Sequence, residues 1–94
     1  MIDIDSLVKT PAELALDVAR REKEIRKKRG MTQDELARRA SVSLGSLRRF
    51  EQTGLIAFDS LIRISLVLEC GDDIANLFSR KTYSSIEEVI NGSA

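Results

Sequence analysis

The basic side chains of this 94-residue chain gather in one region of the sequence. Residues 20–49 hold eleven Lys and Arg but only four Asp and Glu, whereas the whole chain has a net charge of zero. A basic centre between acidic flanks is typical of a surface that binds a polyanion. A solvated charged helix is the alternative for residues 20–29 alone. The basic pairs Arg38–Arg39 and Arg48–Arg49 lie in other segments and favour a shared surface.

Composition argues against other kinds of site. The chain has no His, which removes the usual general base and the commonest metal ligand. Cys70 is the single cysteine, so no intrachain disulfide or CxxC zinc site can form. We therefore expect no enzyme, no cofactor and no metal. The acidic start at residues 1–5 does not match an export signal, and no apolar run reaches membrane-spanning length, so we expect a cytoplasmic protein without membrane contact.

The basic region is expected to begin on a long helix. Thr10 and Glu13 have the spacing of a capping box, with Pro at the first helical position, and Gly30 is the expected stop. The apolar positions of this helix fall on one stripe: Leu14, Val18 and Ile25.

Two shorter helices follow, joined by a turn at residues 41–43. Thr32 and Glu35 predict a second capping box, Ser43 is the expected cap of the next helix, and Gly54 ends it. The positions expected to face inward are Leu36, Ala37, Ala40, Leu47 and Phe50. Two helices joined in this way predict a helix-turn-helix arrangement.

The remaining elements complete a five-helix, all-α domain. We expect a fourth helix over residues 58–69 and a fifth over residues 72–78. The inward set of the fourth helix is Leu61, Ile64 and Leu68, with Phe58 and Val67 nearby. We expect an N-terminal arm over residues 1–9, the domain over residues 10–78 and a short C-terminal extension over residues 79–94. That extension fits either one more turn of helix or an extended arm on a partner.

The segment from Gly30 to Glu51, GMTQDELARRASVSLGSLRRFE, is similar to the Xre/Cro-type helix-turn-helix family of bacterial and phage repressors. The resemblance extends over about residues 25–78. It is carried by the TQxELA run at residues 32–37, the VS pair at 42–43 and the LxxFE run at 47–51. It implies a lambda-repressor-like fold in which the third helix enters the major groove of double-stranded operator DNA.

The resemblance also implies roles for individual side chains. The residues expected to contact DNA are Gln33, Ser43, Leu44, Gly45, Ser46, Arg48 and Arg49. The residues expected to contact phosphates or to steer the DNA are Thr32, Lys27, Lys28, Arg38 and Arg39. Arg guanidinium groups match the O6 and N7 acceptors of guanine. Arg26 and Glu51 occupy positions that often form a structural ion pair in the family. Glu22 stands where an apolar residue is common, and Ser41 where Gly is usual.

The resemblance further implies partners. A homodimer is expected, because one recognition helix makes few base contacts, and its interface is assigned to Ile74, Leu77, Phe78, Ile86, Val89 and Ile90. The pattern over residues 42–54, with Asn76–Phe78, resembles the HipB-like antitoxins, which neutralise HipA-type Ser/Thr kinase toxins and repress their own operon. The alternatives are a stand-alone Xre-family regulator, a phage-type repressor, or a protein-interaction module on the same scaffold.

Overall fold

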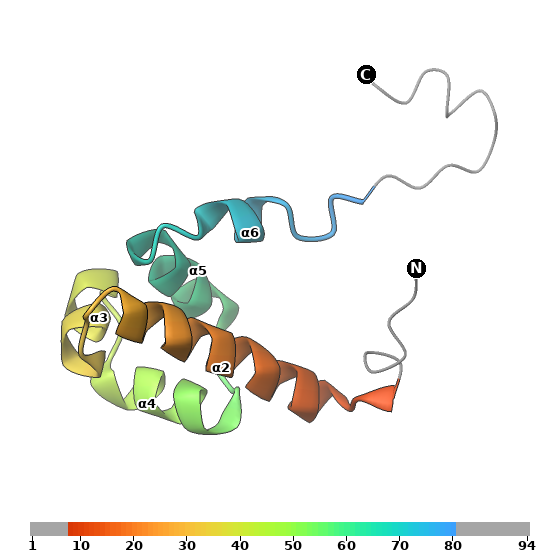
Figure 1. Ribbon diagram of the computed structural model, residues 1–94, viewed down its shortest axis with the longest axis horizontal. Helices are drawn as coiled ribbons and strands as arrows, with labels where there is room; N and C mark the ends of the chain where they lie inside the picture. The colour runs from red at the N-terminus through yellow and green to blue at the C-terminus, as the bar shows by residue number, and fades with distance from the viewer. Residues whose placement is uncertain (1–7, 81–94) are drawn as a thin grey trace, which may run out of the picture.

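The computed structural model describes residues 8–80, and this part of the chain forms α-helices and no strand (Figure 1). The helices, numbered as in Figure 1, are α2 (Pro11–Lys28), α3 (Gln33–Ala40), α4 (Leu44–Thr53), α5 (Phe58–Val67) and α6 (Gly71–Ala75). The all-α, five-helix prediction is confirmed for these residues. Residues 1–7 of the expected arm over residues 1–9, and residues 81–94 of the expected extension over residues 79–94, lie outside the described residues.

Side-chain caps begin the first three of these helices. Thr10 Oγ1 accepts a hydrogen bond from the Glu13 amide at 3.1 Å, and Glu13 Oε1 accepts one from the Thr10 amide at 3.0 Å. Only half of the second predicted box forms. Thr32 Oγ1 accepts from the Glu35 amide at 3.0 Å, while the Glu35 carboxylate lies 3.7 Å from Arg39. Ser43 caps α4, as the sequence predicted.

Ser41 adopts the left-handed conformation that ends α3, with φ +57° and ψ 41°. Its amide donates to the carbonyls of Ala37 and Arg38, which closes the helix and turns the chain toward α4. Ser43 follows in extended conformation and caps the next helix. The turn between the two helices is therefore as short as the sequence predicted.

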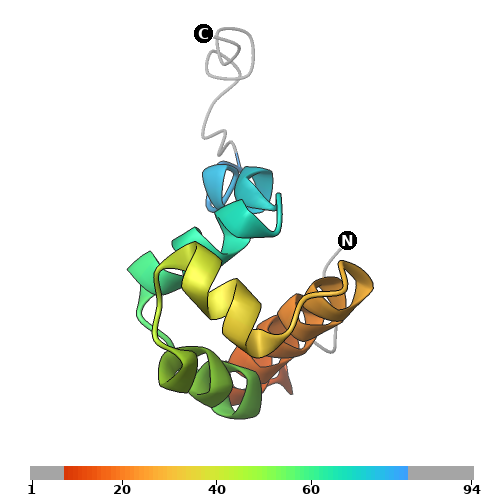
Figure 2. The ribbon, with the colours of Figure 1, turned by 90° about the vertical axis from the view of Figure 1, so that its left-hand side faces the viewer.

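The core lies where α2, α3, α4 and α5 meet. α2 packs against α4, α3 packs against both α4 and α5, and α5 packs against α6. In Figures 1 and 2, α4 and α6 lie at opposite ends of this arrangement. The fully or nearly fully buried apolar residues are Ala19, Leu36, Ala37, Ala40, Leu47, Phe50, Ile64 and Leu68. All but Ala19 belong to the inward positions predicted for the second, third and fourth helices.

The orientation of α2 differs from the prediction. Leu14 and Val18 remain 40% and 38% exposed, and the buried residues of this helix are Ala19, Glu22 and Arg26. The reason is the close approach of the α4 C-terminus, since a Cβ on Gly54 would lie 2.7 Å from the Ala15 carbonyl carbon. Such an approach requires the small alanines of α2 to face α4, which turns the larger apolar stripe away.

The last two helices are shorter than predicted. α5 ends at Val67 because Glu69 has φ +59°, and α6 ends at Ala75, so Leu77 and Phe78 lie beyond it. Phe58, expected to lie near the inward set of α5, is 54% exposed. No helix within residues 8–80 combines the length and hydropathy needed to cross a membrane.

Candidate nucleic-acid interface

α4 presents one polar, cationic face to solvent. Leu47 and Phe50 are buried beneath it. The exposed positions of the helix include Gly45, Ser46, Arg48, Arg49 and Gln52. A single α-helix with its side chains fits the width of the major groove of B-DNA. This face is therefore shaped to enter that groove.

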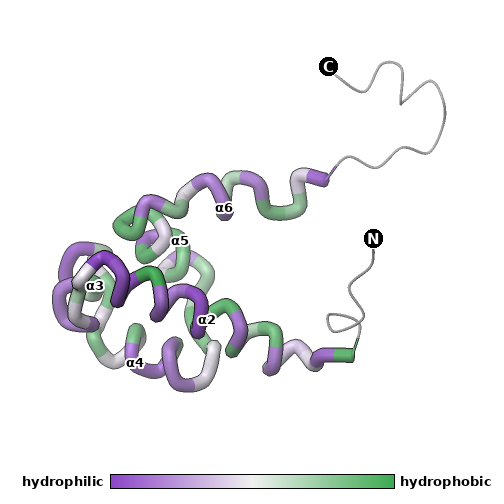
Figure 3. The backbone as a smooth tube through the Cα atoms, viewed as in Figure 1, coloured by the Kyte–Doolittle hydropathy of each residue, from purple (hydrophilic) through white to green (hydrophobic). Residues whose placement is uncertain are grey.

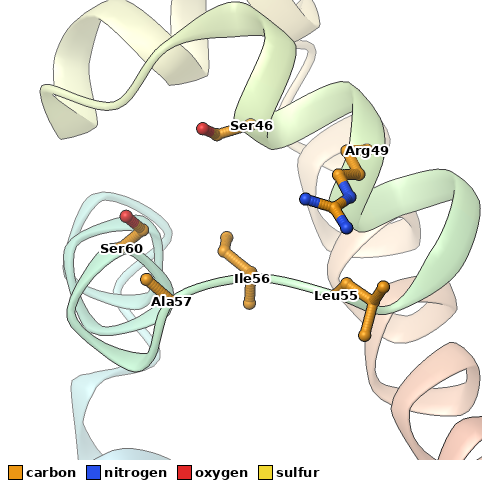
Figure 4. A pocket seen from close by; sticks show the side chains of 6 residues that line it. All are labelled: Ser46, Arg49, Leu55, Ile56, Ala57 and Ser60. Atoms are coloured by element: carbon orange, nitrogen blue, oxygen red, sulfur yellow. The ribbon is translucent and has the colours of Figure 1, made fainter.

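Arg49 extends over a hollow beside α4 (Figure 4). The hollow has a volume of about 160 Å³ and is bounded by Ser46 and Arg49 of α4, the loop residues 55–57 and Ser60 of α5. Neither Arg48 nor Arg49 forms an ion pair with any residue in the range 8–80. Their guanidinium groups are therefore free to bind an acceptor from outside this part of the chain.

The first turn of α5 opens onto the same hollow. Its N-cap is Ala57, which supplies no side-chain hydrogen bond, so the first amides of the helix remain available to an anion. The sequence prediction did not include Ser60 or this helix end. The absence of Ser, Thr, Asp or Asn before Phe58 was the signal that could have indicated it.

A buried ion pair holds α2 and α4 together. Arg26 Nε and Nη2 each lie 2.9 Å from a carboxylate oxygen of Glu51, and Arg26 Nη1 donates to the Met31 carbonyl at 2.9 Å. Both side chains are almost fully buried. The predicted pair is thus present, and it joins α2 to α4.

Glu51 also fixes the side chain of Gln33, the residue expected to contact a phosphate. Gln33 Nε2 donates to Glu51 Oε1 at 2.9 Å, from the first position of α3. One of the two amide hydrogens is used in this bond, and the second remains for another acceptor. The ion pair therefore sets the orientation of Gln33 as well as the packing of α4.

The electrostatics of this cluster include a third carboxyl group, that of Glu22. Burial, with the neighbouring Glu51 carboxylate, raises the pKa of Glu22 to about 8. With Glu22 ionised, neither of its oxygens would have a hydrogen-bond donor. Burial alone would also raise the pKa of Glu51, but hydrogen bonds from Arg26, Glu22 and Gln33 outweigh it and lower that pKa. Glu22 is therefore the member that holds a proton at neutral pH.

Some of the residues expected at the DNA surface have structural contacts as well. The Ser43 hydroxyl accepts from the Ser46 amide at 3.0 Å and donates to the Ser46 hydroxyl at 2.7 Å. Thr32 caps α3. Leu44 is half-buried and packs against the core, which leaves only part of its side chain for a thymine methyl group.

The expected steering charges are exposed but differ in their contacts. Arg38 lies 3.2 Å from Asp34 and Arg39 lies 3.7 Å from Glu35, both as pairs one helical turn apart on α3. Lys27 and Lys28 lie in the last turn of α2, where a positive charge interacts favourably with the negative end of the helix dipole.

The expected dimer residues lie at the α6 end. Ile74 is half-buried, Leu77 is exposed, and Phe78 is 96% exposed. The other three, Ile86, Val89 and Ile90, lie outside the described residues.

Two helices joined by a short turn, the second with a free cationic face, define a helix-turn-helix DNA-binding domain. The model of the helix-turn-helix family matches residues 23–74, more than half of the sequence, and the chain belongs to this family. Members of this family are DNA-binding transcriptional regulators. No match was found among the curated proteins.

Proposed function

We propose that this helix-turn-helix protein is a sequence-specific repressor that binds operator DNA as a symmetric homodimer, with α4 in the major groove. The single observation that carries the proposal is the exposed α4 face, on which Arg48 and Arg49 have no ion-pair partner within residues 8–80. A bidentate contact from Arg to guanine discriminates against a wrong base by about 1–3 kcal/mol. Gly45 adds no side chain and lets the helix approach the bases closely.

Backbone amides and Gln33 are proposed to hold the phosphates on either side of α4. The loop at residues 54–57 carries no basic side chain, but the uncapped start of α5 stands next to it. Gln33 lies at the start of α3 with one amide hydrogen unused. Thr32, Lys27, Lys28, Arg38 and Arg39 are assigned to phosphate contact or steering, which makes binding sensitive to salt.

A dimer is proposed because half-sites one turn of DNA apart multiply the specificity of one short helix. Its interface is assigned to Ile74, Leu77 and Phe78 with Ile86, Val89 and Ile90. In Figures 1 and 2 α6 lies at the opposite end of the molecule from α4. Residues near α6 can therefore contact a second copy without covering the recognition helix.

We further propose that the protein is the autoregulating antitoxin of a HipA-type Ser/Thr kinase, working in the cytoplasm. The support is the resemblance of residues 42–54 and 76–78 to the HipB-like antitoxins. A stand-alone regulator is the alternative. Co-purification with a kinase encoded by the neighbouring gene, and loss of its activity in the complex, would distinguish the two.

The test of the repressor is an anisotropy titration with labelled DNA from upstream of the protein's own gene, against a scrambled duplex, at two salt concentrations. We expect preferential binding to the upstream DNA, weaker at the higher salt. Arg49→Ala should raise the operator Kd roughly 5- to 150-fold and reduce the preference.

The matched control is Arg20→Ala, because Arg20 is exposed on α2 and pairs with Asp17 rather than facing DNA. It should leave the preference for upstream DNA unchanged. Equal binding to both duplexes at both salt concentrations would contradict the proposal. The fold would then serve as a scaffold for protein contacts.

A further inference from the structure

A groove of about 490 Å³ lies where α2, α5 and α6 meet, away from the α4 face. Its apolar lining includes Val18 and Ile25 of α2, Phe58 and Leu61 of α5, Ile74 of α6 and Leu77 just beyond α6. Phe58, Leu77 and Val18 are 54%, 48% and 38% exposed. Apolar area left in water in this way favours the packing of another segment.

The apolar surface continues from the groove to the end of the described chain. Phe58, Ile74 and Leu77 also bound a second, more open hollow, whose fourth side is Phe78. In Figure 3 hydrophobic stretches recur along α2, along α5 and just past α6. The surface to be covered is thus larger than the groove alone.

We propose that in the homodimer this groove receives residues 83–90 of a second copy, and that each copy gives its segment to the other. This inference rests on the homodimer proposed above, and it names the segment that forms the contact between the two copies.

The pattern of residues 83–90 fits the groove in spacing and length. Apolar side chains at Ile86, Val89 and Ile90 stand three or four positions apart, which places them on one face of a helix. Ser84 and Glu87 have the spacing of a capping box. With Ser84 as the N-cap, a helix over residues 85–90 is about 9 Å long, close to the roughly 10 Å of α2 between Val18 and Ile25.

Charge favours the same occupant. The ionisable residues that line the groove are Arg21 and Glu22 of α2 and Asp73 of α6, with Cys70, and Arg21 makes no ion pair within residues 8–80. Glu87 and Glu88 adjoin the apolar positions of the segment, and their charge is opposite to that of Arg21. The segment therefore offers an ion-pair partner to Arg21 on the α2 side of the groove, whereas Asp73 stands on the α6 side.

The direction of the chain favours a second copy as the donor. In Figure 1 the chain past α6 leads away from α5, so the described chain ends beyond the groove that its own α6 lines. For residues 83–90 to reach the groove of their own chain, the chain would have to reverse its direction within a few residues. Reciprocal exchange needs no reversal, and two-fold symmetry makes the same contact twice.

Cys70 makes the donor identifiable, because it lines the groove and is the single cysteine of the chain. The experiment mixes the unchanged protein with the double variant Cys70→Ser/Ile86→Cys, made with a tag that separates the two by mass. After exchange and mild oxidation with oxidised glutathione, a non-reducing gel detects disulfides between the two kinds of chain. Circular dichroism of each variant checks that the helices are intact.

We expect a covalent heterodimer that forms roughly tenfold faster than with Cys70→Ser/Glu88→Cys, whose thiol lies off the apolar face of the segment, since a disulfide requires close and well-directed Cβ atoms. Equal rates for the two variants would overturn the proposal, as would the absence of a heterodimer. In the single variant Ile86→Cys, a disulfide within one chain would assign the groove to the chain's own segment and overturn it as well.

The titration with operator DNA separates this inference from the proposed function. Specific DNA binding by a dimer that forms no disulfide in the mixing experiment would leave the repressor standing and remove the exchanged segment. A disulfide between the two kinds of chain, without specific DNA binding, would keep the exchanged segment and remove the repressor.

Discussion

Glu22 is a buried carboxyl group, and its burial carries a large cost in free energy when the group is ionised. It is 7% exposed, lies on the face of α2 that packs against α4, and shares its surroundings with the buried Glu51. A second carboxylate there would be buried without a donor, so the group keeps its proton. A protonated Glu22 can donate to Glu51 and adds to the bonds from Arg26 and Gln33.

The protonation of Glu22 predicts a stability that depends on pH. Its pKa rises from 4.5 to about 8 on folding, so between these values the folded protein holds a proton that the unfolded chain releases. The free energy of unfolding should therefore fall as the pH rises through this range, by at most about 1.4 kcal/mol per pH unit. Glu22→Gln should remove this loss, and at pH 8 the variant should be more stable by at most roughly 4 kcal/mol.

Urea unfolding at pH 5 and pH 8 measures the effect, and Glu24→Gln, an exposed change on the same helix, is the control. At pH 5 the free energies of unfolding of Glu22→Gln and of the unchanged protein should differ little. If Glu22→Gln and the unchanged protein lost stability in parallel between pH 5 and pH 8, Glu22 would be ionised in the folded state. Glu51 has the opposite effect on the pH dependence of stability. Its pKa is lowered in the folded protein, so the stability that its ionised form contributes is lost as the pH falls.

Between helices, the contact that decides the packing is the approach of the α4 C-terminus to α2. Gly54 has φ +81°, and a Cβ there would lie 2.7 Å from the Ala15 carbonyl carbon and 2.9 Å from the Leu16 amide nitrogen. Backbone atoms cannot move aside as a flexible side chain would. This contact turns Ala19, Glu22 and Arg26 inward and leaves Val18 for the groove.

Gly30 and Gly54 provide a matched pair of substitutions. Both have positive φ, but a Cβ on Gly30 would meet nothing within 4 Å. Gly30→Ala should cost about 1 kcal/mol, the penalty for an L-residue in the left-handed region. Gly54→Ala adds a backbone clash and should cost roughly 1–3 kcal/mol more.

Thermal or urea unfolding of the two glycine variants gives the comparison directly. Equal losses of stability would mean that the α4 C-terminus can move away from α2 without cost. The close approach would then not explain the orientation of α2.

For the whole molecule, the separation of the α4 face from the groove allows DNA and a second copy to bind at the same time. Figure 2 shows α4 and α6 at opposite ends. A chain of this size buries a limited fraction of its surface, and the exposed Phe58, Leu77 and Phe78 add apolar area that a dimer would cover. We therefore expect folding and dimerisation to be coupled.

This coupling predicts a melting temperature that depends on protein concentration. A tenfold increase should raise the Tm by roughly 3–5 °C, because association adds about 1.4 kcal/mol per decade of concentration. Leu77→Asp should remove the dependence, since Leu77 lines the groove. Leu66→Asp is the control, as Leu66 is exposed on α5 and does not line that groove. A Tm of the unchanged protein that is constant over a hundredfold range of concentration would contradict the dimer.

Much of the fold and part of the candidate interface could be predicted from local patterns. Thr10, Thr32 and Ser43 cap helices within three residues of themselves, and the left-handed turn at Ser41 follows from its place between two helices. The Arg26–Glu51 pair was predicted by resemblance, and the exposed face of α4 by helical spacing. The interface residues Ser60 and Ala57 were missed, because they reach the hollow from another helix.

Short-range chemistry thus determined which segments are helical, where they start and which face of α3 and α4 is apolar. The rotation of α2, the proton on Glu22, the hollow beside Arg49 and the groove at α6 depend on contacts between distant segments. A helix with alanines on one face and larger apolar residues on another can bury either one. The choice was made by Gly54, whose missing side chain lets α4 come close enough to pack on Ala15 and Ala19.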